Sequence, residues 1–367
     1  MLNDEGEDNI IVALEHNDRI IQIDIRYQKR SVFEKLSTVT QKPFPALTNL
    51  RLSSSDEIAP VLHEEFLGGS APHLRTIFLH HISFPAFPKL ASSAAHLSEL
   101  FLWEIPITGY ISPEAMATCL AALPCLEYLQ IGFQSPQSRP DRIGLSPPTC
   151  AVLPALIQFV YKGVSEYLED LVARIDTPKL NSLIIQLFMD LMFNIPQLHR
   201  FIACTERIRL PHLAKITFSF SHINIRLEPL TGIVELLIMC GELGQQASSM
   251  AQVCSQLSPL LSHVKQLDIN REGVLVARRA NGIDPTQWFE LFHPFPAVQH
   301  LYIYGELGPL LAQALQELTG ERATQVLPTL RSLFFKGPSP SRSTRENVQA
   351  FLASRQDSNH PVDVYWG

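Results

Sequence analysis

Apolar residues recur along this chain in one short pattern, an L-x-x-L-x-L spacing that in about eight copies follows a proline. A clear copy places Pro45 ahead of Leu47, Leu50 and Leu52. The leading apolar residues of about twelve copies lie at positions 20, 47, 74, 97, 126, 156, 180, 213, 233, 264, 298 and 330, in steps of 20 to 34 residues. Because leucine-rich repeats recur every roughly 20–29 residues, the pattern predicts a structure built from stacked repeats.

Each copy is predicted to form a short strand. Its last two apolar positions lie two residues apart, so their side chains point to one side of a strand. Proline is tolerated where a strand begins, because no ladder donor is needed there. The segments between copies predict helices, because serines precede apolar residues at helical spacing. These helices begin at Ser112-Pro113, at Ser165, at Ser54 or Ser55, and at Ser343 with Glu346 as a capping box. The helix from Ser165 is expected to place Leu168, Leu171, Val172 and Ile175 on its apolar face.

Strands that alternate with helices define the fold prediction, an α/β leucine-rich-repeat solenoid. It is a curved, parallel strand ladder with helices on the convex side. Residues 1–10 are predicted to form an acidic tail, and residues 11–367 a single solenoid of about twelve irregular repeats with a C-terminal cap from about residue 338. The end of the chain predicts an edge strand, because Val362, Val364 and Trp366 alternate with Asp363 and Tyr365.

Residues that flank the last two apolar positions of each copy are predicted to point away from the core. Two aromatic groups result, one in consecutive N-terminal repeats and one near the C-terminus: Phe78, Phe101, Trp103 and Tyr128, and then Tyr302, Tyr304 and Phe334. Aromatic side chains are enriched at the centres of protein interfaces. We therefore expect one of these groups to anchor a protein partner. The alternative is that loops fold back over the rings and make them an auxiliary core.

Composition and charge exclude other classes of function. The net charge is −7 and the basic residues are scattered, whereas a nucleic-acid backbone needs a concentrated basic face. The most apolar stretch, Leu180–Ile202, is interrupted by charges and by Pro196, so no membrane span is expected. The first residues lack the pattern of a signal peptide. The six cysteines form no C-x-x-C pair and are expected to be buried free thiols of an intracellular protein, cytoplasmic or nuclear.

Motifs of known chemistry are incomplete in this chain. His63-Glu64 begins like the zinc-binding H-E-x-x-H, but Leu67 stands where the second histidine would be. His80 and His81 are adjacent and would face opposite ways on a strand. No phosphate-binding glycine loop or nucleophile elbow is present. We therefore expect no catalytic residue, no metal and no cofactor, with an enzyme built from dispersed residues as the alternative.

The repeat pattern resembles the divergent leucine-rich repeats of fungal F-box-type proteins, and Ala13–Ile25 is similar to their first-repeat segment. The resemblance implies recognition of a substrate protein for an SCF-like ubiquitin ligase. An F-box that docks a Skp-type adaptor would precede the repeats, and residues 1–10 do not match one. The chain is then a truncated member whose F-box lies outside it, or a repeat-only relative. The other interpretation is a ligase-independent scaffold of the same fold.

Overall fold

The computed structural model describes residues 4–136, 150–189, 193–272, 283–318, 322–337 and 339–367. Contacts divide the chain into two compact units, an N-terminal unit (Met1–Leu183) and a C-terminal unit (Ile184–Gly367). One strand, β9 (Ser182–Leu187), crosses the boundary between them. That the two units form a single solenoid stays a prediction.

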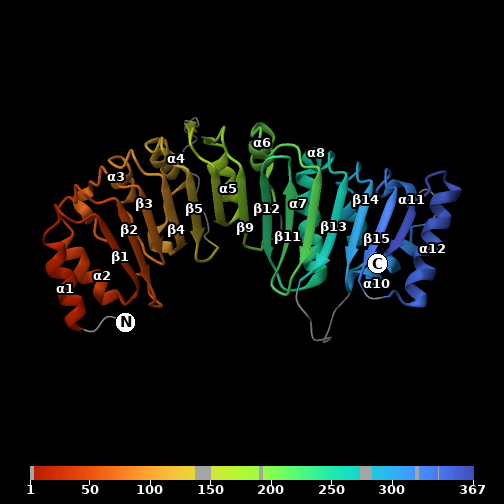
Figure 1. Cartoon of the computed structure of the whole chain (residues 1–367), viewed down its shortest axis with the longest axis horizontal. Helices are drawn as coiled ribbons and strands as arrows, with labels where there is room; N and C mark the ends of the chain where they lie inside the picture. Colours follow the sequence, from red (N-terminus) through yellow and green to blue (C-terminus); the bar gives the residue numbers. More distant parts are fainter. Residues whose placement is uncertain (1–3, 137–149, 190–192, 273–282, 319–321, 338) are drawn as a thin grey trace. The chain divides into compact units, whose positions relative to one another are not determined.

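Within the described residues, six parallel strands form the ladder of the N-terminal unit (Figure 1), in the order β1 (Gln22–Gln28), β2 (Asn49–Ser54), β3 (Thr76–His80), β4 (Glu99–Ile105), β5 (Tyr128–Phe133) and β7 (Gln158–Gly163). The register places equivalent apolar positions side by side. One such row is fully buried: Leu50, Ile77, Leu100, Leu129 and Phe159. A separate two-stranded pair is formed by β6 (Ala151–Val152) and β8 (Ile175–Asp176).

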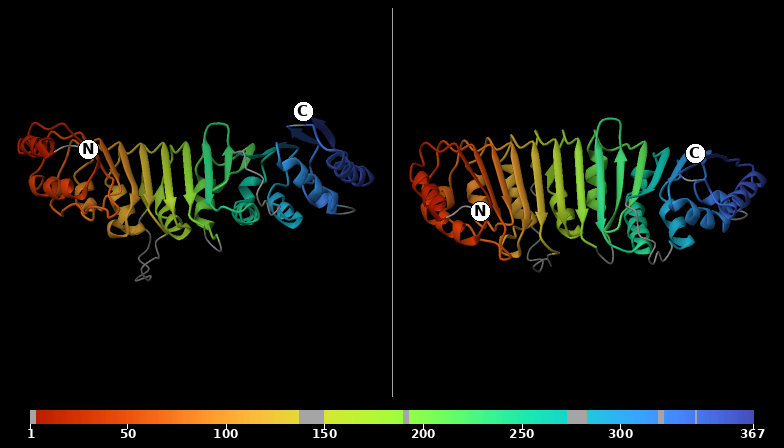
Figure 2. Two further views of the ribbon diagram at one scale, coloured as in Figure 1. Left: turned by 90° about the horizontal axis from the view of Figure 1, so that it is seen from below. Right: turned by 60° about the horizontal axis from the view of Figure 1, so that its bottom comes forward.

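Helices of the N-terminal unit lie against one face of its strands (Figures 1 and 2). They are α1 (Asp4–Leu14), α2 (Arg30–Val39), η1 (Phe66–Gly69), α3 (Phe87–Ala91), η2 (Ile107–Gly109), α4 (Pro113–Ala121) and α5 (Ser165–Val172). The helix predicted at Ser112-Pro113 is confirmed, since the Ser112 side chain accepts a hydrogen bond from the backbone N–H of Ala115.

Three local predictions in this unit need correction. The segment predicted as a tail is helical from Asp4. No helix follows Ser54 or Ser55; instead Val61 forms a parallel bridge with Ser83, and the first helical turn is η1. The helix predicted at Ser165 is present, but Ile175, which was assigned to its apolar face, belongs to β8.

In the C-terminal unit the strand order is β12 (Ile233–Met239), β11 (His222–Glu228), β10 (Leu213–Phe218), β13 (Gln266–Arg271), β14 (His300–Tyr304), β15 (Ser332–Lys336) and β16 (Asp363–Trp366). The strands from β10 through β13 to β16 are parallel. The strand β11 is antiparallel to both of its neighbours, so β10, β11 and β12 form a meander in which β11 connects two copies of the repeat. The sequence pattern did not predict β11, whereas the predicted edge strand at the end of the chain is confirmed as β16.

The helices of the C-terminal unit also lie against one face of its strands (Figures 1 and 2). They are α6 (Pro196–Cys204), α7 (Leu243–Gln256), α8 (Ser258–Leu261), α9 (Pro285–Phe292), α10 (Leu307–Gln316), α11 (Arg322–Gln325) and α12 (Arg342–Asp357). The last helix is capped by Ser341 rather than by Ser343, and Glu346 pairs with Arg342 instead of closing a capping box. The helix is therefore present, with a cap two residues earlier than predicted.

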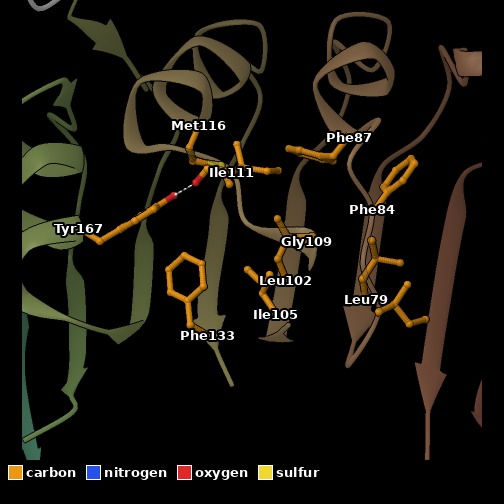
Figure 3. Close-up of a pocket in the computed structure, with 11 residues that line it drawn as sticks. Leu79, Phe84, Phe87, Leu102, Ile105, Gly109, Ile111, Met116, Phe133 and Tyr167 are labelled. Atoms are coloured by element: carbon orange, nitrogen blue, oxygen red, sulfur yellow. Dashed lines mark hydrogen bonds between the residues drawn. The ribbon is translucent and has the colours of Figure 1, made fainter. Parts of the chain in front are cut away.

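The core of each unit lies between its strands and its helices. In the N-terminal unit the void among Leu79, Leu102 and Phe133 measures about 20 Å³, so the side chains pack closely around it (Figure 3). At the rim of that void the Tyr167 hydroxyl donates to the carbonyl oxygen of Ile111 over 3.0 Å, which satisfies a buried polar group. All of the twelve predicted copies coincide with strands. The fold class is confirmed: an α/β leucine-rich-repeat solenoid, mostly parallel, with helices on one face of the ladder.

Candidate functional site

The face of each ladder that the helices do not cover, the open face, carries the two predicted aromatic groups. In a strand, alternate side chains point to opposite faces, so the residues between the buried leucines reach the open face. On the N-terminal unit the N-terminal aromatic group consists of Phe78, Phe101, Trp103 and Tyr128. On the C-terminal unit the predicted residues are Tyr302, Tyr304 and Phe334. Both sets lie on the open face as predicted, and their role in binding stays a prediction.

In the N-terminal aromatic group, only Phe78 and Phe101 form a ring–ring contact. Phe78 and Phe101 are register partners on β3 and β4, and their rings are tilted with centroids 6.1 Å apart. Tyr128 lies on β5 in a different row, opposite Glu99, and is 37% exposed. The structure therefore brings together the two phenylalanines, while Tyr128 stands apart from their contact.

Trp103 packs against residues of the next two strands, Gly132 on β5 and Lys162 on β7. Its ring lies over Gly132, where an added Cβ would come within 2.2 Å of the indole. The ammonium group of Lys162 lies 5.6 Å from the centre of the ring, and Lys162 also forms an ion pair with Glu104. This arrangement combines a cation–π contact with a half-buried ion pair. It indicates a structural role for Trp103.

The C-terminal aromatic row is a continuous stack across three adjacent strands, and it consists of Tyr302, Phe334 and Tyr365. These residues are register partners on β14, β15 and β16. Tyr302 and Phe334 are 4.3 Å apart and inclined by 4°, and Phe334 and Tyr365 are 4.7 Å apart and inclined by 12°. Tyr365 is 49% exposed, and Tyr304, one row away, is 37% exposed. Parallel-strand register is what lets identical positions stack in this way.

One carboxylate continues the row on the next strand. Asp268 on β13 is the register partner of Tyr302. It is half-buried, and burial raises the pKa of its carboxyl group, while a 2.9 Å hydrogen bond from Gln266 and the nearby charge of Lys215 oppose that rise. A half-buried carboxylate beside stacked rings offers both a negative charge and aromatic faces, which is the combination that cations recognise.

Sequence reasoning missed two members of this site. Asp268 flanks the last two apolar positions of its copy, but it was not singled out because only aromatic residues at such positions were taken as candidates. Tyr365 was expected in an edge strand, but nothing in the sequence showed which strand it would pair with. A signal was present, because Asp268, Tyr302 and Phe334 each lie four residues after the leading apolar residue of a copy.

No cluster of three or more potential metal ligands is found in the part of the chain that the structure describes. No helix among those described residues is long and apolar enough to cross a membrane. The cysteines are free, but only three are buried, so the expectation that all are buried was wrong for Cys125, Cys150 and Cys204. Burial raises the pKa of the Cys119 and Cys240 thiols to about 11 each, which leaves them protonated and unreactive near neutral pH.

No protein-family model and no curated protein sequence matches this chain. Among solved structures it is similar to the leucine-rich repeat-containing protein LegL7 from Legionella pneumophila, with 12% sequence identity, a TM-score of 0.31, and coverage of 90% of this chain and 96% of that chain. It is also similar to the structure of a TLR13–ssRNA13 complex, with 14% identity, a TM-score of 0.31, and coverage of 94% of this chain and 44% of that chain. The strand ladder itself defines the class of protein, a leucine-rich-repeat solenoid.

Proposed function

We propose that this chain is a protein-interaction module that captures its partner on the open face of the C-terminal unit. The observation that carries the proposal is the row formed by Asp268, Tyr302, Phe334 and Tyr365, four register partners on adjacent strands. Solenoids use such strand faces as extended binding surfaces. Large, rigid aromatic side chains are the residues that most often carry interface energy.

The chemistry of this row fits a protein segment that presents an arginine. A guanidinium group stacks on aromatic faces and forms paired hydrogen bonds with a carboxylate. An arginine laid along Tyr302 would bring its charged end to Asp268. The ionised carboxylate is disfavoured there by burial, so a cation at this position would relieve an unfavourable charge.

Recognition of a substrate for an SCF-like ubiquitin ligase is the finer form of this proposal, supported by the resemblance of the repeats to those of F-box-type proteins. It requires a Skp-type adaptor to associate with the protein in cells. A ligase-independent scaffold is the other form, and it uses the same surface without the adaptor.

Affinity purification of the tagged protein from its native cells, followed by quantitative mass spectrometry, tests both the proposed binding surface and the proposed association with a ligase. The variant Tyr302→Ala/Asp268→Asn should lose the partner by at least about tenfold, as expected for hot-spot residues. The matched control is Tyr128→Ala, which removes an aromatic ring from the other open face. Equal recovery of every partner by the wild type and the Tyr302→Ala/Asp268→Asn variant would contradict the proposed surface.

The same experiment separates the two finer forms. Recovery of a Skp-type adaptor and a cullin together with the partner would support the ligase interpretation. Recovery of a partner that depends on Tyr302 but comes without an adaptor would favour the scaffold.

A further inference from the structure

The strand β16 leaves one side of its backbone unpaired within the described residues, because it is the last strand of the ladder. Its hydrogen bonds to β15 are made by alternate residues, since Asp363 donates to the carbonyl oxygen of Arg331 and Gly367 donates to that of Phe335. The backbone groups of successive residues point in opposite directions along a strand. The N–H and C=O groups of Val364 and Trp366 therefore point to the open side.

The strand β1, at the edge of the N-terminal ladder, has features that oppose the addition of a further strand, and the strand β16 lacks them. At the outer strand β1, Asp24 and Arg26 form a salt bridge of 2.7 Å, Tyr27 has a φ of 55°, and the register with β2 is irregular beyond Ile25. Charges and bulges are the features that protect edge strands from pairing.

The strand β16 has regular register with β15 from Asp363 to Trp366, and rings on both of its faces. Tyr365 stacks on Phe334 on the open face, while Trp366 stacks on Phe335 at 4.5 Å on the other face. Tyr365 and Trp366 are 49% and 36% exposed. An edge that is regular, aromatic and unpaired within the described residues is suited to receive another strand.

Two charged side chains on the open face, Asp363 and Lys336, indicate which strand could pair with the β16 edge. Asp363 at the start of β16 is exposed, and so is Lys336 at the end of β15. Neither makes an ion pair within the described residues. The register places Lys336 beside Gly367, where a Cβ would lie 3.5 Å from the ammonium nitrogen. Asp363 is four residues from that end of the edge, roughly 13 Å at about 3.3 Å per residue, so the two charges do not meet within one chain.

An antiparallel copy of β16 brings these charges together. Residues with outward backbone groups must face each other, and side chains that are opposite must lie on the same face. One register that meets both conditions pairs Val364 with Trp366 of the second copy and Tyr365 with its own equivalent. That register also sets Asp363 opposite Gly367 of the second copy, beside the second copy's Lys336. The two neighbouring registers, with Val364 or Trp366 opposite itself, set Tyr365 opposite Asp363 or Gly367 and form no such ion pair.

We propose that a second copy of this chain adds to the β16 edge in antiparallel orientation, with Tyr365 opposite Tyr365 and two symmetric Asp363–Lys336 ion pairs. The aromatic row of one copy then continues into that of the other. The two-fold axis makes the same surface serve both partners, as in most homodimers. A strand of this length buries less surface than a standard interface, so the dissociation constant is expected on the order of 100 µM.

Sedimentation equilibrium of the full chain across the micromolar to millimolar range tests the dimer, and charge reversal tests its register. Asp363→Lys and Lys336→Asp should each weaken dimerisation by at least about tenfold, because each places like charges in contact. The double variant Asp363→Lys/Lys336→Asp should restore the wild-type constant to within about threefold. Circular dichroism melting curves establish that each variant is folded. A wild type that stays monomeric throughout, or a dimer that both single reversals leave unchanged, would overturn the proposal.

Cross-linking gives an independent readout. In a background with the exposed cysteines replaced (Cys125→Ser, Cys150→Ser and Cys204→Ser), Tyr365→Cys should form a disulfide-linked dimer on mild oxidation. The Cα atoms of directly opposite residues that are not hydrogen-bonded lie about 4.5 Å apart, within the range of a disulfide. Asp363→Cys is the matched control and should not cross-link to itself. Efficient cross-linking through Asp363→Cys but not through Tyr365→Cys would overturn the register.

Discussion

The two open faces carry similar sets of aromatic residues, yet the structure uses them differently. On the N-terminal unit the rings of Phe78 and Phe101 are tilted against each other, and Trp103 lies over Gly132 with the ammonium group of Lys162 nearby. On the C-terminal unit three rings stack nearly parallel on adjacent strands. The rings are register partners on both units, so the difference lies in their geometry: the C-terminal rings form one continuous parallel row, whereas the N-terminal pair is tilted and Trp103 covers Gly132.

The largest effect that would separate the two faces concerns partner capture. Phe334→Ala removes the central ring of the C-terminal row, and we expect it to lower partner affinity by about 100-fold, as the loss of a hot-spot aromatic does. Phe101→Ala on the N-terminal unit is the matched change and should alter affinity less than about threefold. Binding of the purified partner, measured by calorimetry, compares the two variants. A larger loss for Phe101→Ala would move the site to the N-terminal unit.

The second effect concerns the packing under Trp103. A Cβ at Gly132 would overlap the indole, so Gly132→Ala should lower the free energy of unfolding by about 1–3 kcal/mol, the usual cost of overpacking. Trp103→Ala in the same chain should recover much of that loss, because it removes the clash. Gly241→Ala is the control, since the nearest atom to its Cβ is 3.8 Å away. Additive losses in the double variant, measured by urea unfolding, would show that Trp103 is not what fills this space.

The sequence predicted those parts of the fold in which the spacing of apolar residues repeats from copy to copy. The twelve strand copies were predictable because their apolar spacing repeats, and each copy buries the same positions. The antiparallel strand β11 was missed because it is not a copy of the repeat, although His222–Glu228 alternates polar and apolar residues, which is typical of a strand. The helix expected after Ser54 fails for a local reason: Pro60 and Leu62 exchange backbone hydrogen bonds with Ser83, which holds that segment extended.

The candidate site was predictable only in part. Period-2 alternation identified Tyr302, Tyr304 and Phe334 as open-face residues, because that depends on position within one strand. Asp268 occupies the same position in its copy as Tyr302 and Phe334, so its place in the row follows from the repeat, whereas the partner of Tyr365 depends on a strand pairing that the repeat pattern does not give. Trp103 shows a further limit: the alternation placed it on the open face, but its packing against Gly132 and Lys162 depends on residues of the next two strands.

A third effect tests whether Lys162 holds Trp103. The side chains of Lys162 and Glu104 are 15% and 24% exposed, so their ion pair is shielded from solvent more than a surface pair. Lys162→Met keeps the length of the side chain but removes its charge, and should lower the free energy of unfolding by about 1 kcal/mol through loss of the cation–π contact and the ion pair. Tryptophan fluorescence should also change, because the ammonium group beside the indole is gone. The double variant Lys162→Met/Glu104→Gln, which leaves no unpaired carboxylate, should recover part of the stability but not the fluorescence.

The smallest expected effect is a gain in the free energy of unfolding, rather than a loss, when Asp268 is replaced. Burial raises the pKa of this carboxyl group, so the folded state favours the protonated form. Its contribution to stability is therefore complete below the ordinary pKa of an aspartate and is lost as the pH rises through the raised value. Asp268→Asn should stabilise the protein slightly at neutral pH, by no more than about 0.5 kcal/mol, and this gain should vanish at about pH 3. Urea unfolding at the two pH values measures the difference, and the same variant should bind the partner less tightly. A residue that costs stability and yet is needed for capture would mark the C-terminal row as a binding surface, whereas a variant that is less stable at neutral pH would show that Asp268 serves the fold.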